Sequence, residues 1–353
     1  MSRFLSSRHS RLVPYTPGEQ PKGRKYIKLN TNESPFPPSP KAIEYAHRAA
    51  AELELYPDPE SCALRAAAAA EFGVKSENII AANGSDEILS FAFTAFCDSE
   101  TAAAFPDITY GFYPVFAKLN GVPYTEIPLA ENFAINTEDY LSIGKTIFIA
   151  NPNAPTGLTL SAAEIEKIVI SNPENVVVID EAYVDFGAES CVPLTQKYDN
   201  LLVVQTFSKS RSMAGARLGF GIGCAELICD LNTIRNSTNP YNVNRMTAAA
   251  GLGALEDSGY MRSNCKEIEK VREYTKSELM RLGFRMTDSS ANFVFAAHPK
   301  ISGGELYRRL RECGILVRHF EKERISEYNR ITIGTQEQMQ TLIEKTEEIL
   351  KEV

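Results

Sequence analysis

Residues 201–209 read LLVVQTFSK and join a short apolar run to a lysine. Residues 201–204 are all apolar, without the alternation of apolar and polar residues that a half-buried strand shows. Such a run is typical of a strand buried on both faces of a sheet. Hydroxyl side chains at Thr206 and Ser208 precede Lys209, and Arg217 follows eight residues after it. A lysine in this setting can form a Schiff base with an aldehyde cofactor that carries a phosphate. An ordinary surface lysine at the end of a strand has the same pattern.

Six further apolar runs of the same kind alternate with helical patterns. This order predicts an α/β fold with a large, doubly wound domain on a mainly parallel seven-stranded sheet. The further runs are residues 79–82, 101–105, 122–127, 146–150, 176–179 and 218–222.

The composition of the remaining segments predicts how the chain divides. Residues 1–40 are rich in Pro, Gly and basic residues, and we expect an extended arm that joins a small domain. Residues 41–242 carry the alternating pattern of the large domain. Residues 243–353 have long helical patterns and few strands, which predicts a smaller α+β domain.

Three positions mark expected helix starts. Ser61 precedes an alanine-rich pattern that ends near Gly73, and we expect its side chain to cap the first turn. Ser161 begins the sequence SAAE, which is a capping-box pattern. Another helix is expected to begin at Asp86.

The composition excludes several classes of protein. The 353 residues include 37 basic and 45 acidic side chains, and the net charge of −8 favours neither nucleic acid nor an anionic membrane. No apolar run reaches the roughly 20 residues of a membrane helix, and no signal-peptide core follows residues 1–4. We therefore expect a soluble, cytoplasmic protein. The seven cysteines and four histidines show neither a disulfide framework nor metal-ligand spacing, so we expect no metal.

Polar side chains follow the run 79–82, and open parallel sheets bind ligands at the carboxyl ends of their strands. The next residues read NGSDE, and Gly84, Ser85 and Asp86 can receive a phosphate at the start of a helix. The alternative is a plain helix cap by Ser85 or Asp86.

The run 176–179 is followed by Asp180 and, three residues later, by Tyr183. A buried aspartate there can keep a pyridinium nitrogen protonated while the tyrosine hydrogen-bonds the ring oxygen. The alternative is an aspartate satisfied by backbone amides. Tyr110 can stack on such a ring or belong to the core. The residues of the opening stretch expected to bind the phosphate are Thr206, Ser208 and Arg217.

Four motifs, taken in order, resemble the fold type I aminotransferases that use pyridoxal 5′-phosphate. They are NGSDE at 83–87, NPNAPTG at 151–157, DEAY at 180–183 and TFSK at 206–209. The resemblance implies pyridoxal 5′-phosphate as the cofactor. The catalytic residues that it implies are Lys209, Asp180 and Tyr183.

Further segments are similar to the histidinol-phosphate aminotransferase branch of the class II aminotransferases. They are LVPYTPG at 12–18, KLNTNESP at 28–35, YPDP at 56–59, ANFV at 291–294 and RITIGT at 330–335.

This resemblance implies roles for residues outside the predicted strands. Tyr56 would reach the cofactor phosphate in the neighbouring subunit, which implies an obligate homodimer. Tyr15, Asn32, Arg318 and Arg330 would line the substrate pocket, where the arginines would grip a phosphate or a carboxylate. The alternative for the two arginines is surface ion pairing with nearby glutamates.

One position departs from the pattern of the family. Most members have asparagine immediately before Pro-Thr-Gly, where its amide contacts the ring oxygen of the cofactor. This chain has Ala154 there, after Asn153. Either Tyr183 makes that contact alone or Asn153 supplies it through a shifted loop.

The resemblance implies a ping-pong transamination of histidinol phosphate and 2-oxoglutarate to imidazole acetol phosphate and glutamate, a step of histidine biosynthesis. The partners would be a small-molecule amino donor and a 2-oxo acid. Lys209 would carry the proton, which requires the lowered pKa that burial and Arg217 favour. The alternatives are an aromatic amino acid aminotransferase, a phosphothreonine-type decarboxylase and a noncatalytic ligand-binding relative.

Overall fold

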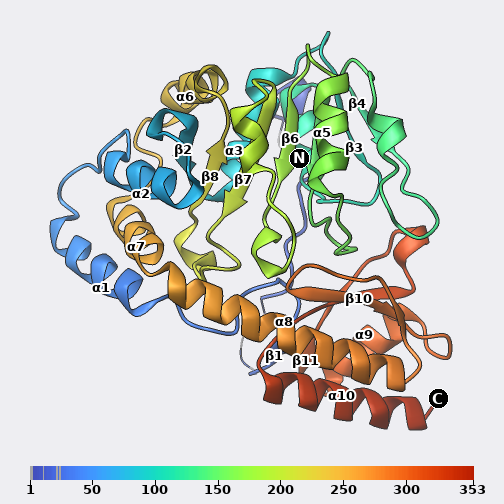
Figure 1. Ribbon diagram of the computed structural model, residues 1–353. Coiled ribbons are helices and arrows are strands. Elements are labelled where there is room, and N and C mark those ends of the chain that lie inside the picture. Colours follow the sequence, from blue (N-terminus) through green and yellow to red (C-terminus); the bar gives the residue numbers. More distant parts are fainter. Residues whose placement is uncertain (1–2, 11, 21–22, 24) are drawn as a thin grey trace.

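The computed structural model describes residues 3–10, 12–20, 23 and 25–353, and its largest element is a seven-stranded sheet (Figure 1). Strand β8 runs in the opposite direction to the other six strands of this sheet. The mainly parallel, doubly wound sheet predicted from the sequence is therefore confirmed. The strands, in spatial order, are β2 (Ile79–Ala82), β8 (Gly219–Ile222), β7 (Leu201–Thr206), β6 (Val177–Asp180), β5 (Thr146–Ala150), β3 (Ala103–Pro106) and β4 (Tyr124–Ile127).

Alternate side chains of the inner strands point to opposite faces of this sheet and pack in two different cores. Helices cover both faces and complete these cores. Val177 and Ile179 of β6 pack in one core and Val178 packs in the other. The helices of the first core are α1 (Pro40–Ala49), α2 (Cys62–Phe72), α5 (Ala162–Ser171) and α7 (Arg245–Glu256). Those of the second core are α3 (Gly84–Phe96), α4 (Tyr113–Asn120) and α6 (Ala225–Thr238).

The predicted helix starts have different outcomes. The capping box of Ser161 with Glu164 is confirmed. The predicted cap by Ser61 is wrong, because Ser61 has a left-handed φ of 47° and its side chain caps nothing. The carboxylate of Asp58 instead accepts the N–H of Cys62 at 2.7 Å. Helix α3 begins at Gly84, two residues before the expected Asp86.

A second, antiparallel sheet lies below the large one (Figure 1). Its strands, in spatial order, are β12 (Arg318–His319), β13 (Tyr328–Thr332), β10 (Phe293–Ala297) and β9 (Arg285–Met286). The arm contributes β1 (Ile27–Lys28), which pairs in parallel with β11 (Ile315–Leu316). The helices packed with this sheet are α8 (Ser258–Arg281), α9 (Gly303–Glu312) and α10 (Gln336–Lys351).

The expected division at residues 1–40, 41–242 and 243–353 needs one adjustment. Helix α7 packs in the core of the large sheet, whereas α8 packs in the core of the second sheet. We therefore propose that the large domain ends at Asp257, between these two helices.

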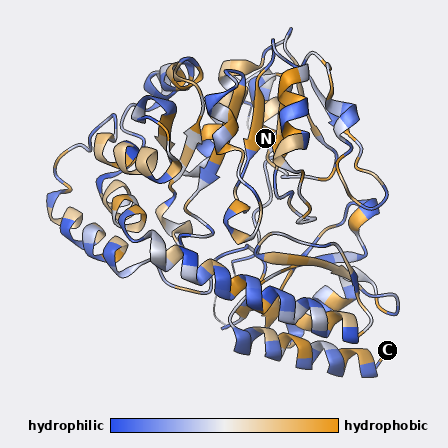
Figure 2. Ribbon diagram, viewed as in Figure 1, coloured by the Kyte–Doolittle hydropathy of each residue, from blue (hydrophilic) through white to orange (hydrophobic). Residues whose placement is uncertain are grey.

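Figure 2 shows many hydrophilic residues along α8 and α10. No helix within the described residues has both the length and the apolarity needed to cross a membrane.

The contact between α1 and α7 generates a stability prediction. A Cβ atom at Gly253 would lie 2.6 Å from the backbone oxygen of Lys41, which cannot move freely inside α1. We expect Gly253→Ala to destabilise the protein by about 1–3 kcal/mol in urea-induced unfolding. Gly259→Ala is the matched control, because no atom lies within 4 Å of its Cβ position. An equal loss of stability in both variants would contradict tight packing at Gly253.

Candidate active site

The strand register brings the predicted polar residues to one edge of the large sheet. Asp180 at the end of β6 lies opposite Ala150 of β5 and Val204 of β7. Two cavities open at this edge, an inner one of about 320 Å³ and an outer one of about 380 Å³. They are adjacent, because they share lining residues. The shared residues are Thr31, Tyr110, Ala154, Tyr183 and Lys209.

Lys209 lies where the two cavities meet. Its Nζ donates to the backbone oxygen of Thr31 at 3.1 Å and lies 5.9 Å from the centre of the Tyr183 ring. Burial lowers the pKa of Lys209 to about 8, and the positive charge of Arg330 contributes to this lowering more than that of Arg217. A fraction of the amine is therefore neutral near physiological pH, as nucleophilic and basic chemistry require.

The inner cavity contains groups suited to a phosphate. Arg217 donates to Asp86 Oδ2 at 2.9 Å and to Ser208 Oγ at 3.3 Å, and Thr206 Oγ1 donates to Ser208 Oγ at 3.0 Å. Ser85 also lines this cavity, in the first turn of α3. Hydroxyls, a guanidinium and a helix N-terminus thus converge there, as they do in anion-binding sites.

Two glycines make this cradle possible. Gly84 has a φ of +78°, and a Cβ there would lie 2.8 Å from Nη2 of Arg217. A Cβ at Gly219 would lie 2.6 Å from the backbone nitrogen of Ser85. Larger residues at either position would displace the groups that converge on the cavity.

Asp180 is 5% exposed and lines the inner cavity. Its Oδ1 accepts the backbone N–H of Ala182 at 3.2 Å, and its Oδ2 accepts the hydroxyl of Tyr113 at 3.3 Å. Burial raises the pKa of Asp180 to about 7, and the negative charge of Asp86 adds to the shift. One backbone amide and a phenol leave the carboxylate able to accept from a ligand cation. The sequence analysis did not identify Tyr113.

Tyr183 and Asn32 form a hydrogen-bonded pair. Asn32 Nδ2 donates to the Tyr183 hydroxyl at 2.9 Å, and Asn32 Oδ1 accepts from Thr332 Oγ1 at 3.0 Å. Burial raises the pKa of Tyr183. Asn32 is not among the described residues that line either cavity, and its amide contacts the hydroxyl of Tyr183, which lines both.

Asn153 is likewise held away from the cavities. Its Nδ2 donates to the oxygen of Ile108 at 2.9 Å, and its Oδ1 accepts from Thr109 Oγ1 at 2.8 Å. Ala154, and not Asn153, is among the described residues that line the cavities. Of the two alternatives for the ring oxygen, this geometry favours Tyr183 alone.

Tyr110 lines both cavities and donates its hydroxyl to Asp86 Oδ1 at 2.6 Å. Its ring can therefore face a ligand while its hydroxyl holds the carboxylate that pairs with Arg217. Burial raises the pKa of Tyr110, which keeps the phenol protonated as a donor.

The outer cavity is lined by Tyr15, Arg318 and Arg330. Arg330 is half-buried; it donates to the backbone oxygen of Asn30 at 3.2 Å, and its buried Nε has no hydrogen-bond partner among the described residues. Burial lowers the pKa of Arg330. Arg318 donates to the backbone oxygen of Thr16 at 3.4 Å. Within the described residues neither arginine is ion-paired with a carboxylate, so the alternative of pairing with nearby glutamates has no support.

Tyr56 lies outside both cavities of its own chain. Its side chain is 78% exposed, and its ring stacks on Tyr241 with centroids 4.6 Å apart. The structure therefore does not bring it together with Lys209 of the same chain.

A further contact, at the rim of the outer cavity, was not predicted from the sequence. Lys322 Nζ donates to the backbone oxygen of Asp107 at 2.6 Å, and Arg324 donates to Asp107 Oδ2 at 3.1 Å. These residues connect the strand end of β3 to the loop before β13. No spacing in the sequence links these positions, which are more than 200 residues apart.

Residues 24–345 match the family described as aminotransferase class I and II, and the chain belongs to this family. It is 48% identical to the histidinol-phosphate aminotransferase of Brachyspira hyodysenteriae, over 99% of this chain and 100% of that protein. It is 47% identical to the histidinol-phosphate aminotransferase of Acinetobacter baumannii, over 97% of this chain and 96% of that protein.

Solved structures share the fold. The histidinol-phosphate aminotransferase of Sinorhizobium meliloti, in complex with pyridoxal-5′-phosphate, has a TM-score of 0.89 at 22% identity, over 99% of this chain and 100% of that chain. That of Clostridium acetobutylicum has a TM-score of 0.86 at 24% identity, over 93% of this chain and 100% of that chain. The predicted fold type I architecture and the family resemblance are confirmed.

The buried carboxyl group of Glu181, next to Asp180, is expected to make the free energy of unfolding depend on pH. It accepts from Ser190 Oγ at 2.7 Å and Gln205 Nε2 at 2.8 Å, and burial raises its pKa to about 7. A carboxyl whose pKa is higher in the folded than in the unfolded state stabilises the fold at low pH. This stabilisation is lost as the pH rises through the folded pKa.

We therefore expect the free energy of unfolding of the cofactor-free protein to fall relative to that of Glu181→Gln between about pH 5 and about pH 8, by at most about 3 kcal/mol. Urea titrations across this range measure the difference. Glu305→Gln is the control, because Arg308 lowers the pKa of Glu305 and moves its titration below this window. A difference between wild type and Glu181→Gln that does not change with pH would contradict the raised pKa.

Proposed function

We propose that the chain is a pyridoxal 5′-phosphate-dependent histidinol-phosphate aminotransferase of the cytoplasm, active as a homodimer. The observation that carries the proposal is the position of Lys209 between a phosphate cradle and a pair of arginines, in the lining of two adjacent cavities. The name of the relatives that are 47–48% identical over nearly the full chain supports the same substrate.

The residues of the inner cavity fit the proposed cofactor. Ser85, Thr206, Ser208 and Arg217 would hold its phosphate, in the cradle that Gly84 leaves open. Bound there, pyridoxal phosphate would supply an electron sink for the carbanion formed at the substrate.

Two further residues would tune the cofactor ring. Asp180 would accept from the ring nitrogen; its raised pKa means that a cationic partner is needed to restore the ionised carboxylate. Tyr183 would donate to the ring oxygen, oriented by Asn32. We assign Asn153 no direct contact, because its amide already donates to the backbone oxygen of Ile108 and to Thr156 Oγ1.

Lys209 would first hold the aldehyde covalently and then act as the base. Once an amino donor displaces it, the free amine of Lys209 would take the proton from the α-carbon of the substrate. It would then deliver that proton to C4′ of the cofactor. The pKa of about 8 supports this exchange, because both protonation states are populated near neutral pH.

The outer cavity would select the substrate. Two arginines without a carboxylate partner among the described residues can bind a phosphate or a carboxylate, and the planar fork of arginine suits both groups. Histidinol phosphate carries a phosphate in one half-reaction and 2-oxoglutarate carries carboxylates in the other. Tyr15 would pack on the apolar part of the substrate.

The exposure of Tyr56 supports the proposed dimer. An aromatic side chain that is 78% exposed and outside the cavity of its own chain is suited to reach the cofactor phosphate of a second subunit. By this proposal each site is completed by its partner.

Replacement of Lys209 tests the assignment of the cofactor. We expect Lys209→Ala to lack the visible absorbance of the lysine-bound cofactor and to lose more than about 10³-fold in turnover, because nucleophile and base are removed together. Lys270→Ala is the matched control on the surface of α8. Retention of the absorbance and the turnover by Lys209→Ala would refute the role of Lys209.

Replacement of Arg330 tests the substrate. We expect Arg330→Gln to raise KM for histidinol phosphate by about 10–100-fold with the cofactor spectrum unchanged, since a charge-assisted contact is lost. Arg318→Gln is the second variant, in case the half-buried Arg330 is needed for folding. Better turnover of phenylalanine than of histidinol phosphate by the wild type would favour an aromatic aminotransferase. Release of carbon dioxide would favour a decarboxylase, and a colourless protein would favour a noncatalytic relative.

A further inference from the structure

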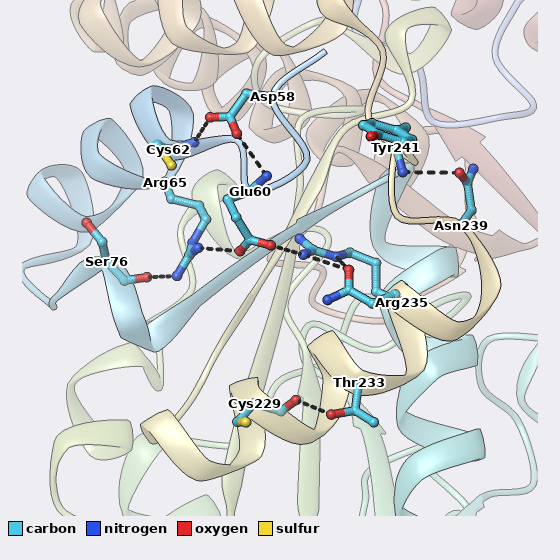
Figure 3. A network of polar contacts seen from close by, with 11 residues as sticks. Asp58, Glu60, Cys62, Arg65, Ser76, Cys229, Thr233, Arg235, Asn239 and Tyr241 are labelled. Atoms are coloured by element: carbon cyan, nitrogen blue, oxygen red, sulfur yellow. Dashed lines mark hydrogen bonds and ion pairs between the residues drawn. The ribbon is translucent and has the colours of Figure 1, made fainter. Parts of the chain in front are cut away.

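A buried arginine joins two segments that the active site does not contain. Arg235, near the end of α6, is 1% exposed, and its Nη2 donates to Glu60 Oε1 at 2.8 Å. Arg65 of α2 donates to the other oxygen of Glu60 at 3.2 Å and to the backbone oxygen of Ser76 at 2.7 Å. Glu60 thus bridges two arginines from two helices (Figure 3).

The same two segments meet again at the surface through aromatic rings. Tyr56 lies four residues before Glu60, and Tyr241 lies six residues after Arg235. The two tyrosine rings stack with an interplanar angle of 27°. The ion pair and the ring stack are therefore two cross-links between the same stretches of chain.

Hydrogen-bonded turns lie in both segments. The carboxylate of Asp58 accepts the N–H groups of Glu60 and Cys62, at 3.0 and 2.7 Å. On the other segment, the N–H of Asn239 donates to the backbone oxygen of Arg235 at 2.8 Å, and the side chain of Asn239 accepts the N–H of Tyr241 at 3.3 Å (Figure 3). These bonds hold the backbone between the ion pair and the two rings.

We propose that the Glu60–Arg235 ion pair is a positioning device that fixes Tyr56 in the orientation needed to reach the cofactor phosphate of the partner subunit. The inference rests on the proposed role of Tyr56 in the neighbouring site. An exposed ring loses conformational entropy when it becomes ordered on binding, and prior anchoring reduces that loss. Loss of Glu60 removes the carboxylate that pairs with the buried charge of Arg235, whereas loss of Arg235 leaves Glu60 paired with Arg65 alone. Either change breaks the link between the two segments.

Hybrid dimers separate this role from a general contribution to folding. Two chains with different affinity tags are coexpressed and purified in tandem, one of them inert through Lys209→Ala. Only the chain with Lys209 can give the visible absorbance of the lysine-bound cofactor, and its site would receive Tyr56 from the inert chain. Dissociation of the cofactor is followed by this absorbance, and the stability of each hybrid by thermal unfolding.

We expect Glu60→Gln in the inert chain to weaken cofactor binding at the intact site by about tenfold, the size of one charge-assisted hydrogen bond to a phosphate. The same substitution in the chain that carries Lys209 should leave binding unchanged. Arg235→Met should repeat this asymmetry, and Glu305→Gln, in an exposed ion pair on α9, should have no effect in either chain.

The reference is Tyr56→Phe in the inert chain. If it has no effect, the proposed action of Tyr56 across the dimer is wrong, and the inference is overturned with it. If Tyr56→Phe weakens binding but Glu60→Gln and Arg235→Met do not, only the inference is overturned. Equal weakening from Glu60→Gln in either chain would also overturn it, because a purely structural ion pair has that effect.

Discussion

The parallel pairing of β5, β6 and β7 determines where this protein can place charge. Every residue of these three strands is buried, so polar side chains can occur only where the strands end. The register then sets Asp180 beside Val204, and Thr206 and Lys209 follow at the same edge. The phosphate cradle, the buried carboxylate and the lysine are close together because the strands end together.

This arrangement costs electrostatic free energy in the absence of ligands. Burial moves the pKa of Lys209 down and that of Asp180 up, so each group is pushed toward its neutral form. Burial also lowers the pKa of the half-buried Arg330, whose Nε has no hydrogen-bond partner among the described residues. A ligand that brings a ring cation to Asp180 and anionic groups to the arginines relieves these costs, which makes the site selective for charge as well as for shape.

The sequence predicted the parts of the fold that depend on local pattern. Residues 79–82 and 146–150 are strands with the expected bounds. Short, continuous apolar runs such as these are typical of strands that are buried on both faces of a sheet. The reversed direction of β8 was not predicted, although no helical pattern separates it from β7 and a parallel connection needs a crossover. The contact of Tyr113 with Asp180 and the contacts of Asn32 with Tyr183 and Thr332 were not predicted, because they depend on tertiary structure: Asn32 and Thr332 are 300 residues apart.

Arginines in both cavities act on the same lysine. Arg330 lowers the pKa of Lys209 more than Arg217 does, so the arginine of the outer cavity has the larger electrostatic influence of the two on the amine. An anion bound at Arg330 offsets that positive charge, and by Coulomb's law it raises the proton affinity of Lys209. The group that recognises the substrate would therefore also adjust the base that acts on it. Filling of the outer cavity would favour proton uptake by Lys209 when a substrate is in place to give up its proton.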